Sequence, residues 1–327
     1  MKKKGVGIGI SFYGIGYGNG FPDVSKAVVR LLDGGKIGIY TGATEVGQGS
    51  KTVLSQIGAE TLKIDSKDIL FICEDTSLMP DSGTTAASRQ TYNTGNAIKA
   101  ACEKFKEKLL GAAQRELGLN SVSGLTMEKG EIYLNFFPHK RISFKELSKI
   151  YKDNPIEVEG IFTAQTVEMN SETGQGAPYW PYTFNACGVE VEVDTLTGKV
   201  EILKAVFAQD TGRAINPKLV EGQMDGGFAM ALGYALFEDL EIDKGRIKNN
   251  KFSKYLIPTA MDMIDVKNII IENPENTAPY GAKGIGESVT IPITPAILNA
   301  IYDAVGVRIT EIPVTPSRLL KFLADKA

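Results

Sequence analysis

Residues 27–42 read AVVRLLDGGKIGIYTG, and residues 188–210 read GVEVEVDTLTGKVEILKAVFAQD. Each stretch contains two apolar runs with the spacing of half-buried strands, joined by a glycine-containing turn. Each is followed by a Gly-Gln pair and an apolar helical pattern, SKTVLSQIGAETLKI at 50–64 and GQMDGGFAMALGYALFE at 222–238. The sequence therefore predicts a duplicated unit of strand, tight turn, strand and helix.

The two glutamines of this repeat, Gln48 and Gln223, occupy matching places, and each is expected just before a helix N-terminus. Unpaired amide donors and the positive end of the helix dipole favour anions such as phosphate there. A neighbouring glutamine amide can both donate and accept a hydrogen bond. Two interpretations stay open: the helix starts hold two ends of one anionic ligand, or both glutamines merely cap helices.

The segment between the repeats, PDSGTTAASRQTYNTG at residues 80–95, is dense in hydroxyls, small residues and amides. It could offer many donors to one ligand, or it could be a solvated loop. Within it, Arg89 is expected either to pair with a phosphate or to form a surface salt bridge. A long amphipathic helix is predicted from about Ala97, with its apolar face at Ile98, Ala101, Phe105, Leu109 and Ala112.

A single carboxylate ends the glycine-rich stretch YGAKGIGE at residues 280–287. Small residues let the backbone approach a bulky group closely. A carboxylate held by such a loop is a candidate general base, because its surroundings set its reach and its proton affinity. The alternative is a surface turn in which Glu287 only starts the next helix.

The composition of the chain excludes several classes of site and partner. The chain has 327 residues, a net charge of -3, three cysteines and one histidine, His139. The balanced charge argues against nucleic-acid binding, and no apolar run reaches the roughly 20 residues that span a bilayer. A disulfide framework, a zinc or haem site and an iron–sulfur cluster held by this chain are not expected. A cytoplasmic location is expected, and the chemistry must use carboxylates, amides or a cofactor.

Strands and helices interleave without strict alternation, so the predicted class is α+β. We expect two related lobes, each a β-hairpin or small sheet with helices, around a cofactor cleft. The first lobe is predicted over residues 1–165 and the second, carrying the Glu287 loop, over residues 166–327. Thr294-Pro295 predicts a helix start, with proline at the first helical position.

Four blocks in this order resemble the C-terminal half of the molybdopterin-binding region of the xanthine oxidase family of molybdenum hydroxylases. The blocks are GATEVGQGSKT, PDSGTTAASRQT, DTGRAINPKLVEGQMDGG and GAKGIGES with PAILNAIYDAVG. Within this family the chain resembles the medium molybdopterin subunit of nicotinate dehydrogenase from anaerobic bacteria, in which large and medium subunits share one site. The rest of the region is then expected on a large subunit.

The resemblance implies a role for particular residues. Glu287 matches the family's active-site glutamate, which acts as the base toward a water-derived nucleophile. Phe12, with Tyr13 beside it, matches the aromatic segment that packs on a flat substrate. The positions implied to bind the cofactor are Gln48, Gly49, Thr85, Ala86, Ala87, Ser88, Thr91, Gln223, Lys283 and Gly284.

The resemblance also implies hydroxylation of a heteroaromatic substrate, nicotinate or a purine such as xanthine, with water as oxygen source. Molybdenum would be held by molybdopterin, in its cytosine dinucleotide form, with no side-chain ligand, and a sulfido or a selenido ligand both stay open. Electrons would pass to a 2Fe-2S subunit and an FAD subunit. The expected partners are those two and the large molybdopterin subunit, with no nucleic acid or membrane. The alternative is a non-catalytic structural subunit or a cofactor-insertion factor.

Overall fold

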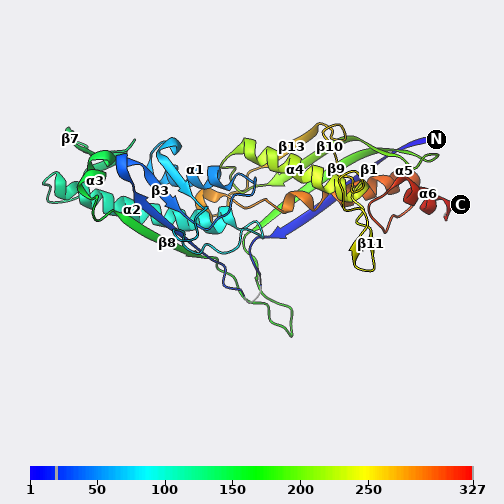
Figure 1. The fold of residues 1–327 in the computed structure, drawn as a ribbon, viewed down its shortest axis with the longest axis horizontal. Helices are drawn as coiled ribbons and strands as arrows, with labels where there is room; N and C mark the ends of the chain where they lie inside the picture. The colour runs from blue at the N-terminus through cyan, green and yellow to red at the C-terminus, as the bar shows by residue number, and fades with distance from the viewer. Residues whose placement is uncertain (19–20, 326–327) are drawn as a thin grey trace. The chain divides into compact units, whose positions relative to one another are not determined.

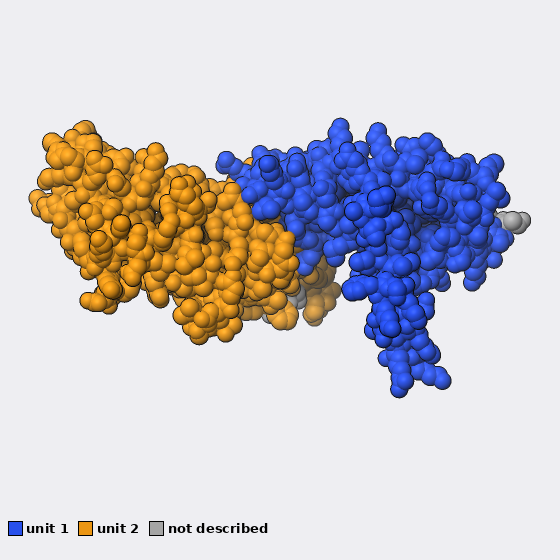
Figure 2. Space-filling view, turned by 45° about the horizontal axis from the view of Figure 1, so that its top comes forward, with its two compact units in different colours: residues 1–13, 182–273, 285–327 blue, residues 14–181, 274–284 orange. Residues whose placement is uncertain are grey.

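The computed structural model describes residues 1–18 and 21–325. The chain forms two compact units, each assembled from separate segments (Figure 2). Unit 1 comprises Met1–Tyr13, Tyr182–Asn273 and Ile285–Ala327, and unit 2 comprises Gly14–Pro181 and Pro274–Gly284. Each unit is described by itself below. The lobes predicted as 1–165 and 166–327 stay a prediction.

Unit 1 is built on a four-stranded sheet in the order β1-β9-β10-β13 (Figure 1). Strands β9 and β10 are antiparallel, whereas β10 and β13 are parallel. One face of the sheet packs against helices α4 and α5, and the core between them includes Val191, Phe207, Phe228 and Ile297. The elements are β1 (Lys2–Gly14), β9 (Tyr182–Asp194), β10 (Val200–Asp210), α4 (Pro217–Leu236), β11 (Ile242–Asp243), β12 (Arg246–Ile247), β13 (Val266–Ile271), η5 (Ser288–Thr290), α5 (Ile293–Val305) and α6 (Pro316–Ala324).

Strand β1 lies directly on helix α5, because its inward positions are glycines. A Cβ atom on Gly5, Gly7 or Gly9 would come within 2.3 Å of a backbone oxygen of the α5 region. Side chains of α5 also satisfy the backbone of β1: Asp303 accepts from the amide of Val6 at 2.8 Å, and Asn299 donates to the carbonyl of Ile8 at 2.9 Å. Two backbone groups of the edge strand β1 are thus satisfied by side chains of α5.

Unit 2 has a four-stranded sheet in the order β4-β3-β2-β8, with α2 packed on β2 and β8 and with α1 beside α2. The predicted face of α2 is confirmed, since Ile98, Ala101, Phe105, Leu109 and Ala112 are all fully buried. The elements are β2 (Val24–Leu31), η1 (Asp33–Gly35), β3 (Ile37–Tyr40), α1 (Ser50–Leu62), η2 (Ser66–Asp68), β4 (Ile69–Ile72), η3 (Gln90–Thr94), α2 (Gly95–Glu116), β5 (Leu125–Glu128), β6 (Glu131–Leu134), β7 (Phe137–Ser143), α3 (Phe144–Ile150), β8 (Glu157–Thr163) and η4 (Pro279–Gly281).

The α+β class is confirmed, and so is the repeated order of strand, turn, strand and helix, as β2-β3-α1 in one unit and β9-β10-α4 in the other. One detail of the repeat is wrong. Helix α4 begins at Pro217, so Gln223 lies inside the helix rather than before its N-terminus. The side chain of Asn216 accepts from the amide of Leu219, and proline occupies the first turn, which together form a stronger start signal than Gly222.

One segment of the described chain, Ser288–Val305, has the length and mean hydropathy (1.2) of a membrane-crossing helix. Half of that segment is buried, and its helix α5 carries Ala296, Ile297, Ala300 and Ile301 in the core of unit 1. The core helix of a globular protein can have the same length and hydropathy. Because α5 packs against β9 and α4, it is a core helix of unit 1.

Candidate functional site

Glu287 lies in unit 1, at the N-cap position of the short helix η5, and its side chain is exposed in this chain. Its carboxylate oxygen Oε2 accepts a hydrogen bond from the phenolic hydroxyl of Tyr13, at the end of β1. A neutral donor of this kind holds the carboxylate in one orientation without neutralising its charge. The arrangement leaves a proton acceptor that is oriented and accessible.

A buried polar network fixes the residue that follows Glu287. The side-chain amide of Asn185 on β9 donates to the carbonyl oxygen of Ser288 at 2.7 Å and to Oε1 of Gln209 at 3.1 Å. The hydroxyl of Ser11 on β1 donates to Oδ1 of Asn185 at 2.7 Å. Three sheet residues thereby position the turn that carries Glu287. Polar residues at inward positions of otherwise apolar strands were the available signal in the sequence.

Phe12 and Tyr13 lie on opposite faces of β1, because successive strand residues alternate. Tyr13 is half-buried and bonded to Glu287, whereas Phe12 is exposed and packs at 5.7 and 6.2 Å, between ring centroids, from Tyr182 and Phe184. Of these two aromatic residues, Tyr13 is the one whose side chain donates a hydrogen bond to Glu287. A substrate-binding role for Phe12 and Tyr13 stays a prediction.

In unit 2, the predicted cofactor loop Thr84–Ser88 is held in a strained form. Ala87 and Ser88 both have a φ of 53°, in the left-handed region that non-glycine residues avoid. The amide of Gly16 donates to the carbonyl oxygen of Ala87 at 3.1 Å. A Cβ atom on Gly284 would lie 1.7 Å from the carbonyl oxygen of Ser88, so only glycine fits there. Thr85, Ala86, Ala87, Ser88 and Gly284 therefore belong to one local structure.

Gln48 and Gly49 also lie in unit 2, but the helix start beside them is filled from within the chain. The carboxylate of Glu45 accepts from the amides of Gly49 and Lys51, each at 3.0 Å, and from that of Gly47 at 2.8 Å. Partial burial alone would raise the pKa of Glu45, but these amide donors lower it below its usual value. A carboxylate of this chain therefore already accepts from the amides at the start of α1, and an anion site there stays a prediction.

Gln48 instead closes its own loop. Its Oε1 accepts from the amide of Val46 at 2.7 Å, and its Nε2 donates to the carbonyl of Thr44 at 2.9 Å. The other three predicted cofactor positions lie in other elements than Gln48. Thr91 lies in η3, Lys283 is buried beside Gly284, and Gln223 is half-buried within α4 of unit 1. A cofactor-binding role for these residues stays a prediction.

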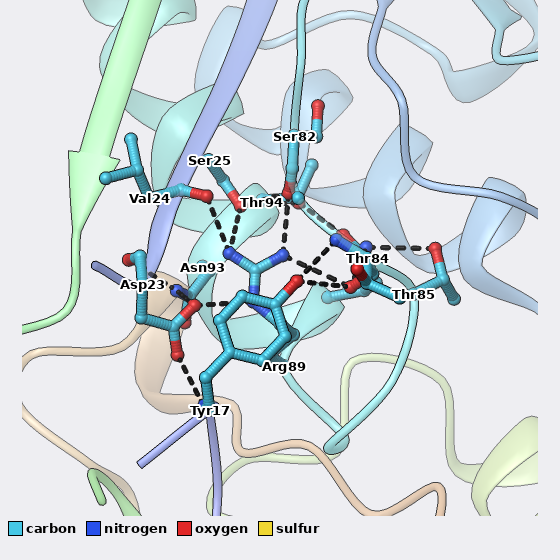
Figure 3. Close-up of polar contacts among 12 residues, drawn as sticks. Tyr17, Asp23, Val24, Ser25, Ser82, Thr84, Thr85, Arg89, Asn93 and Thr94 are labelled. Carbon is cyan, nitrogen blue, oxygen red and sulfur yellow. Dashed lines mark hydrogen bonds and ion pairs between the residues drawn. The ribbon is translucent and has the colours of Figure 1, made fainter. Parts of the chain in front are cut away.

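Neither expectation for Arg89 is met. Its side chain is fully buried and forms an ion pair with Asp23, which is 4% exposed, at 2.5 Å (Figure 3). It is therefore not a surface salt bridge, and its charge is not presented to a phosphate. Sequence reasoning missed this pair because the two residues are distant in the chain and neither stands in a recognisable motif.

The loop Thr84–Ser88 borders an open hollow of about 540 Å³ in unit 2, lined by Tyr17, Phe21, Asp81, Gly83 and Thr84.

The three cysteines do not line this hollow. Each is buried with a free thiol, and burial raises the pKa of Cys187 to about 12. Over residues 1–18 and 21–325, no group of three or more His, Cys, Asp or Glu side chains could hold a metal ion.

Comparison with known proteins identifies the family to which this chain is similar. Residues 1–264 match the model of the molybdopterin cofactor-binding domain. A putative xanthine dehydrogenase molybdenum-binding subunit of Escherichia coli K12 is 36% identical over 97% of this chain and 42% of its own length. The chain thus spans about two-fifths of the length of that relative.

Solved structures agree in fold. Aldehyde oxidoreductase from Desulfovibrio gigas matches with a TM-score of 0.82 and 30% identity, over 99% of this chain and 33% of the other. Quinoline 2-oxidoreductase from Pseudomonas putida 86 matches with a TM-score of 0.83 and 26% identity, over 99% and 42% of the two chains. The resemblance seen in the sequence is confirmed at this level, and the chain belongs to the molybdopterin cofactor-binding domain family.

Proposed function

We propose that this chain is the molybdopterin-binding subunit of a molybdenum hydroxylase. It acts on a heteroaromatic substrate, nicotinate or a purine such as xanthine, with water as oxygen source. The observation that carries this proposal is the oriented, accessible carboxylate of Glu287 in a member of this cofactor-binding family. When bound, the molybdenum cofactor would supply the centre that accepts the electrons of the oxidation.

The proposed role of Glu287 is to accept the proton of the attacking water-derived nucleophile. General bases of this kind contribute about two to four decades in rate. Tyr13 orients the carboxylate, and Asn185 fixes the backbone of Ser288 beside it. Because hydrogen bonds from sheet residues hold this turn, the Glu287 side chain is already in position before the reaction. This favours rapid proton transfer.

Two parts of this chain differ in how well they suit the molybdopterin cofactor: the loop Thr84–Ser88 and the start of α1. The Thr84–Ser88 loop offers hydroxyls and backbone groups with no carboxylate within it, and Gly284 allows close packing at Ser88, so this part suits a flat, polar, anionic group. The start of α1 does not suit a phosphate, because Glu45 lies on it. We keep Gln48, Gly49, Thr91, Gln223 and Lys283 as proposed cofactor contacts, and the cytosine dinucleotide form as the proposed cofactor.

The proposed partner is a large molybdopterin subunit, together with 2Fe-2S and FAD subunits. An apolar stripe on β1, facing away from α5, supports it: Val6, Ile8, Ile10 and Phe12 are 60, 63, 77 and 69% exposed. Exposed apolar stripes of this kind mark interaction sites. Family relatives are more than twice as long as the part that this chain matches. We propose that the large molybdopterin subunit covers this stripe.

Ile8→Asp and Ile10→Asp should each prevent one-to-one co-purification with the large subunit, because each buries a charge in an apolar interface. Leu196→Asp is the matched control, since Leu196 is 78% exposed in the turn between β9 and β10 of the same unit. Unchanged co-purification in both stripe variants would exclude this surface as the subunit interface.

The experiment that tests the function is an assay of the purified complex against nicotinate, xanthine, hypoxanthine and a simple aldehyde, combined with molybdenum and selenium analysis. We expect stoichiometric molybdenum and turnover of one heteroaromatic compound. A complex that carries molybdenum but turns over none of these substrates would favour a structural subunit. Sub-stoichiometric recovery with transient pterin would favour an insertion factor.

A further inference from the structure

Arg89 directly follows the loop Thr84–Ser88, and its buried guanidinium binds backbone groups at the start of this loop and groups of strand β2 (Figure 3). One terminal nitrogen, Nη1, donates to the carbonyl of Ser82 at 2.6 Å and more weakly to that of Thr84 at 3.4 Å. The other, Nη2, donates to the carbonyl of Val24 at 2.7 Å and to the hydroxyl of Ser25 at 2.9 Å. The side chain thus connects the start of the loop to strand β2.

Asp23 fixes the guanidinium from the opposite side. Its Oδ1 accepts from Nε of Arg89 at 2.5 Å and from the side-chain amide of Asn93 at 2.7 Å, and its Oδ2 accepts from the amide of Tyr17 at 3.2 Å. A buried ion pair is weak evidence for stability, because desolvation offsets much of the attraction. Its directional hydrogen bonds, by contrast, specify one backbone arrangement.

The loop Thr84–Ser88 requires contacts that specify its backbone arrangement. Two successive non-glycine residues, Ala87 and Ser88, hold left-handed backbone conformations. The hydroxyl of Thr85 accepts from the amide of Thr44 at 2.9 Å and from Nε2 of Gln90 at 3.0 Å. Strained conformations persist only where surrounding contacts over-determine them, and they cluster at ligand-binding sites.

We propose that Arg89 is a positioning residue that holds the Thr84–Ser88 loop in the shape that binds the molybdopterin cofactor. This inference rests on the proposed function, and it gives the buried pair a role in cofactor binding rather than in overall stability. The role requires arginine specifically. Its planar fork reaches Asp23, Ser82 and Val24 at once, whereas a lysine ammonium is a point charge on one stem.

The test compares Arg89→Lys with Arg30→Lys in the full chain, purified together with the polypeptides that accompany it. Arg30 is a matched control in the same unit: its Nε also binds a carboxylate, that of Glu157, and its guanidinium also lies over a tyrosine ring, that of Tyr40 at 5.1 Å. The guanidinium of Arg89 lies 4.7 Å from the ring of Tyr17. The readouts are amide hydrogen exchange of residues 82–88, bound pterin and molybdenum, and the unfolding midpoint.

A second variant tests the same loop without touching the buried charge. Tyr17→Phe removes a hydroxyl that donates to the carbonyl of Thr84 at 3.3 Å and accepts from its amide. Its control is Tyr151→Phe, which removes a hydroxyl bonded to Glu116 at 3.1 Å in the same unit. Tyr17→Phe decides the question if Arg89→Lys fails to fold.

We expect amide exchange in residues 82–88 to rise by about tenfold or more in Arg89→Lys, and by a smaller factor in Tyr17→Phe, with bound pterin falling in the same order. Both controls should keep their pterin. Unchanged loop exchange in the variants would overturn the positioning role itself. Faster loop exchange with full pterin content would overturn the link to the cofactor. Wild-type protein that never contains pterin would instead contradict the proposed function.

Discussion

The phenolic hydroxyl of Tyr13 donates to Oε2 of Glu287, two residues that are 274 positions apart in the chain. The bond joins the end of the first strand of unit 1 to the turn that carries the proposed base. The turn is fixed independently by Asn185, which donates to the carbonyl of Ser288. The carboxylate is therefore positioned by a sheet, while its own side chain stays accessible.

Replacing Tyr13 by phenylalanine should lower kcat by about tenfold or more, because a hydrogen bond to a charged group contributes roughly 1.5–3 kcal/mol. KM and the molybdenum content should stay unchanged, since the ring and the cofactor contacts remain. Steady-state kinetics of the metal-loaded complex measure both. Tyr302→Phe, on α5 in the same unit, is the control and should retain wild-type kcat. A change confined to KM would place Tyr13 in substrate binding instead.

The carboxylate of Glu45 should stabilise the start of α1 by about 1 kcal/mol at neutral pH, as helix-capping side chains do. Its pKa is lowered in the folded chain, so this stability is present above the unfolded value of 4.5 and is lost as pH falls through the folded pKa. The difference in unfolding free energy between wild type and Glu45→Gln should therefore shrink below about pH 4.5.

Urea unfolding across pH measures this difference. Glu60→Gln is the control on the same helix, because the carboxylate of Glu60 forms an exposed ion pair with Lys63 and does not cap the helix start. A Glu45→Gln protein that matches wild type at pH 7 would show that the cap contributes nothing.

Gly7→Ala should destabilise the chain by about 2 kcal/mol or more, because its Cβ would lie 2.2 Å from the carbonyl oxygen of Ala296 and would force α5 away from β1. Gly188→Ala, on the adjacent strand, has open space around the new atom and should change stability little. Denaturant titration distinguishes the two. Equal stability of both variants would contradict the direct contact between β1 and α5.

Regular elements of this fold were predictable because apolar periodicity determines them. The strands β2, β3, β9 and β10 follow from the strand-like spacing of their apolar residues, and the apolar face of α2 follows from helical spacing. Strand β1 was missed because its inward positions are Gly5, Gly7 and Gly9, which carry no apolar side chain to reveal a buried face. The predicted start of α4 is too late in the chain, because the helix begins at Pro217 after the capping residue Asn216 and runs through Gly222.

The site was predictable only in part, since its geometry depends on contacts between distant segments. The glycine-rich stretch singled out Glu287, but the sequence could not show that Tyr13 and Asn185 hold its turn. Likewise, the hydroxyl-rich loop was evident, while the burial of Arg89 with Asp23 was not. Local pattern also could not show that Glu45 folds back onto the start of its own helix.

The measurement that tests the central claim most directly is the turnover of Glu287→Gln in the assembled, molybdenum-loaded complex. The substitution keeps the shape of the side chain and its capacity to accept from Tyr13, but it removes the basic carboxylate. We predict unchanged subunit composition and molybdenum content, with turnover reduced by about a hundredfold or more. Retention of more than about a tenth of wild-type turnover would contradict the role of Glu287 as the base.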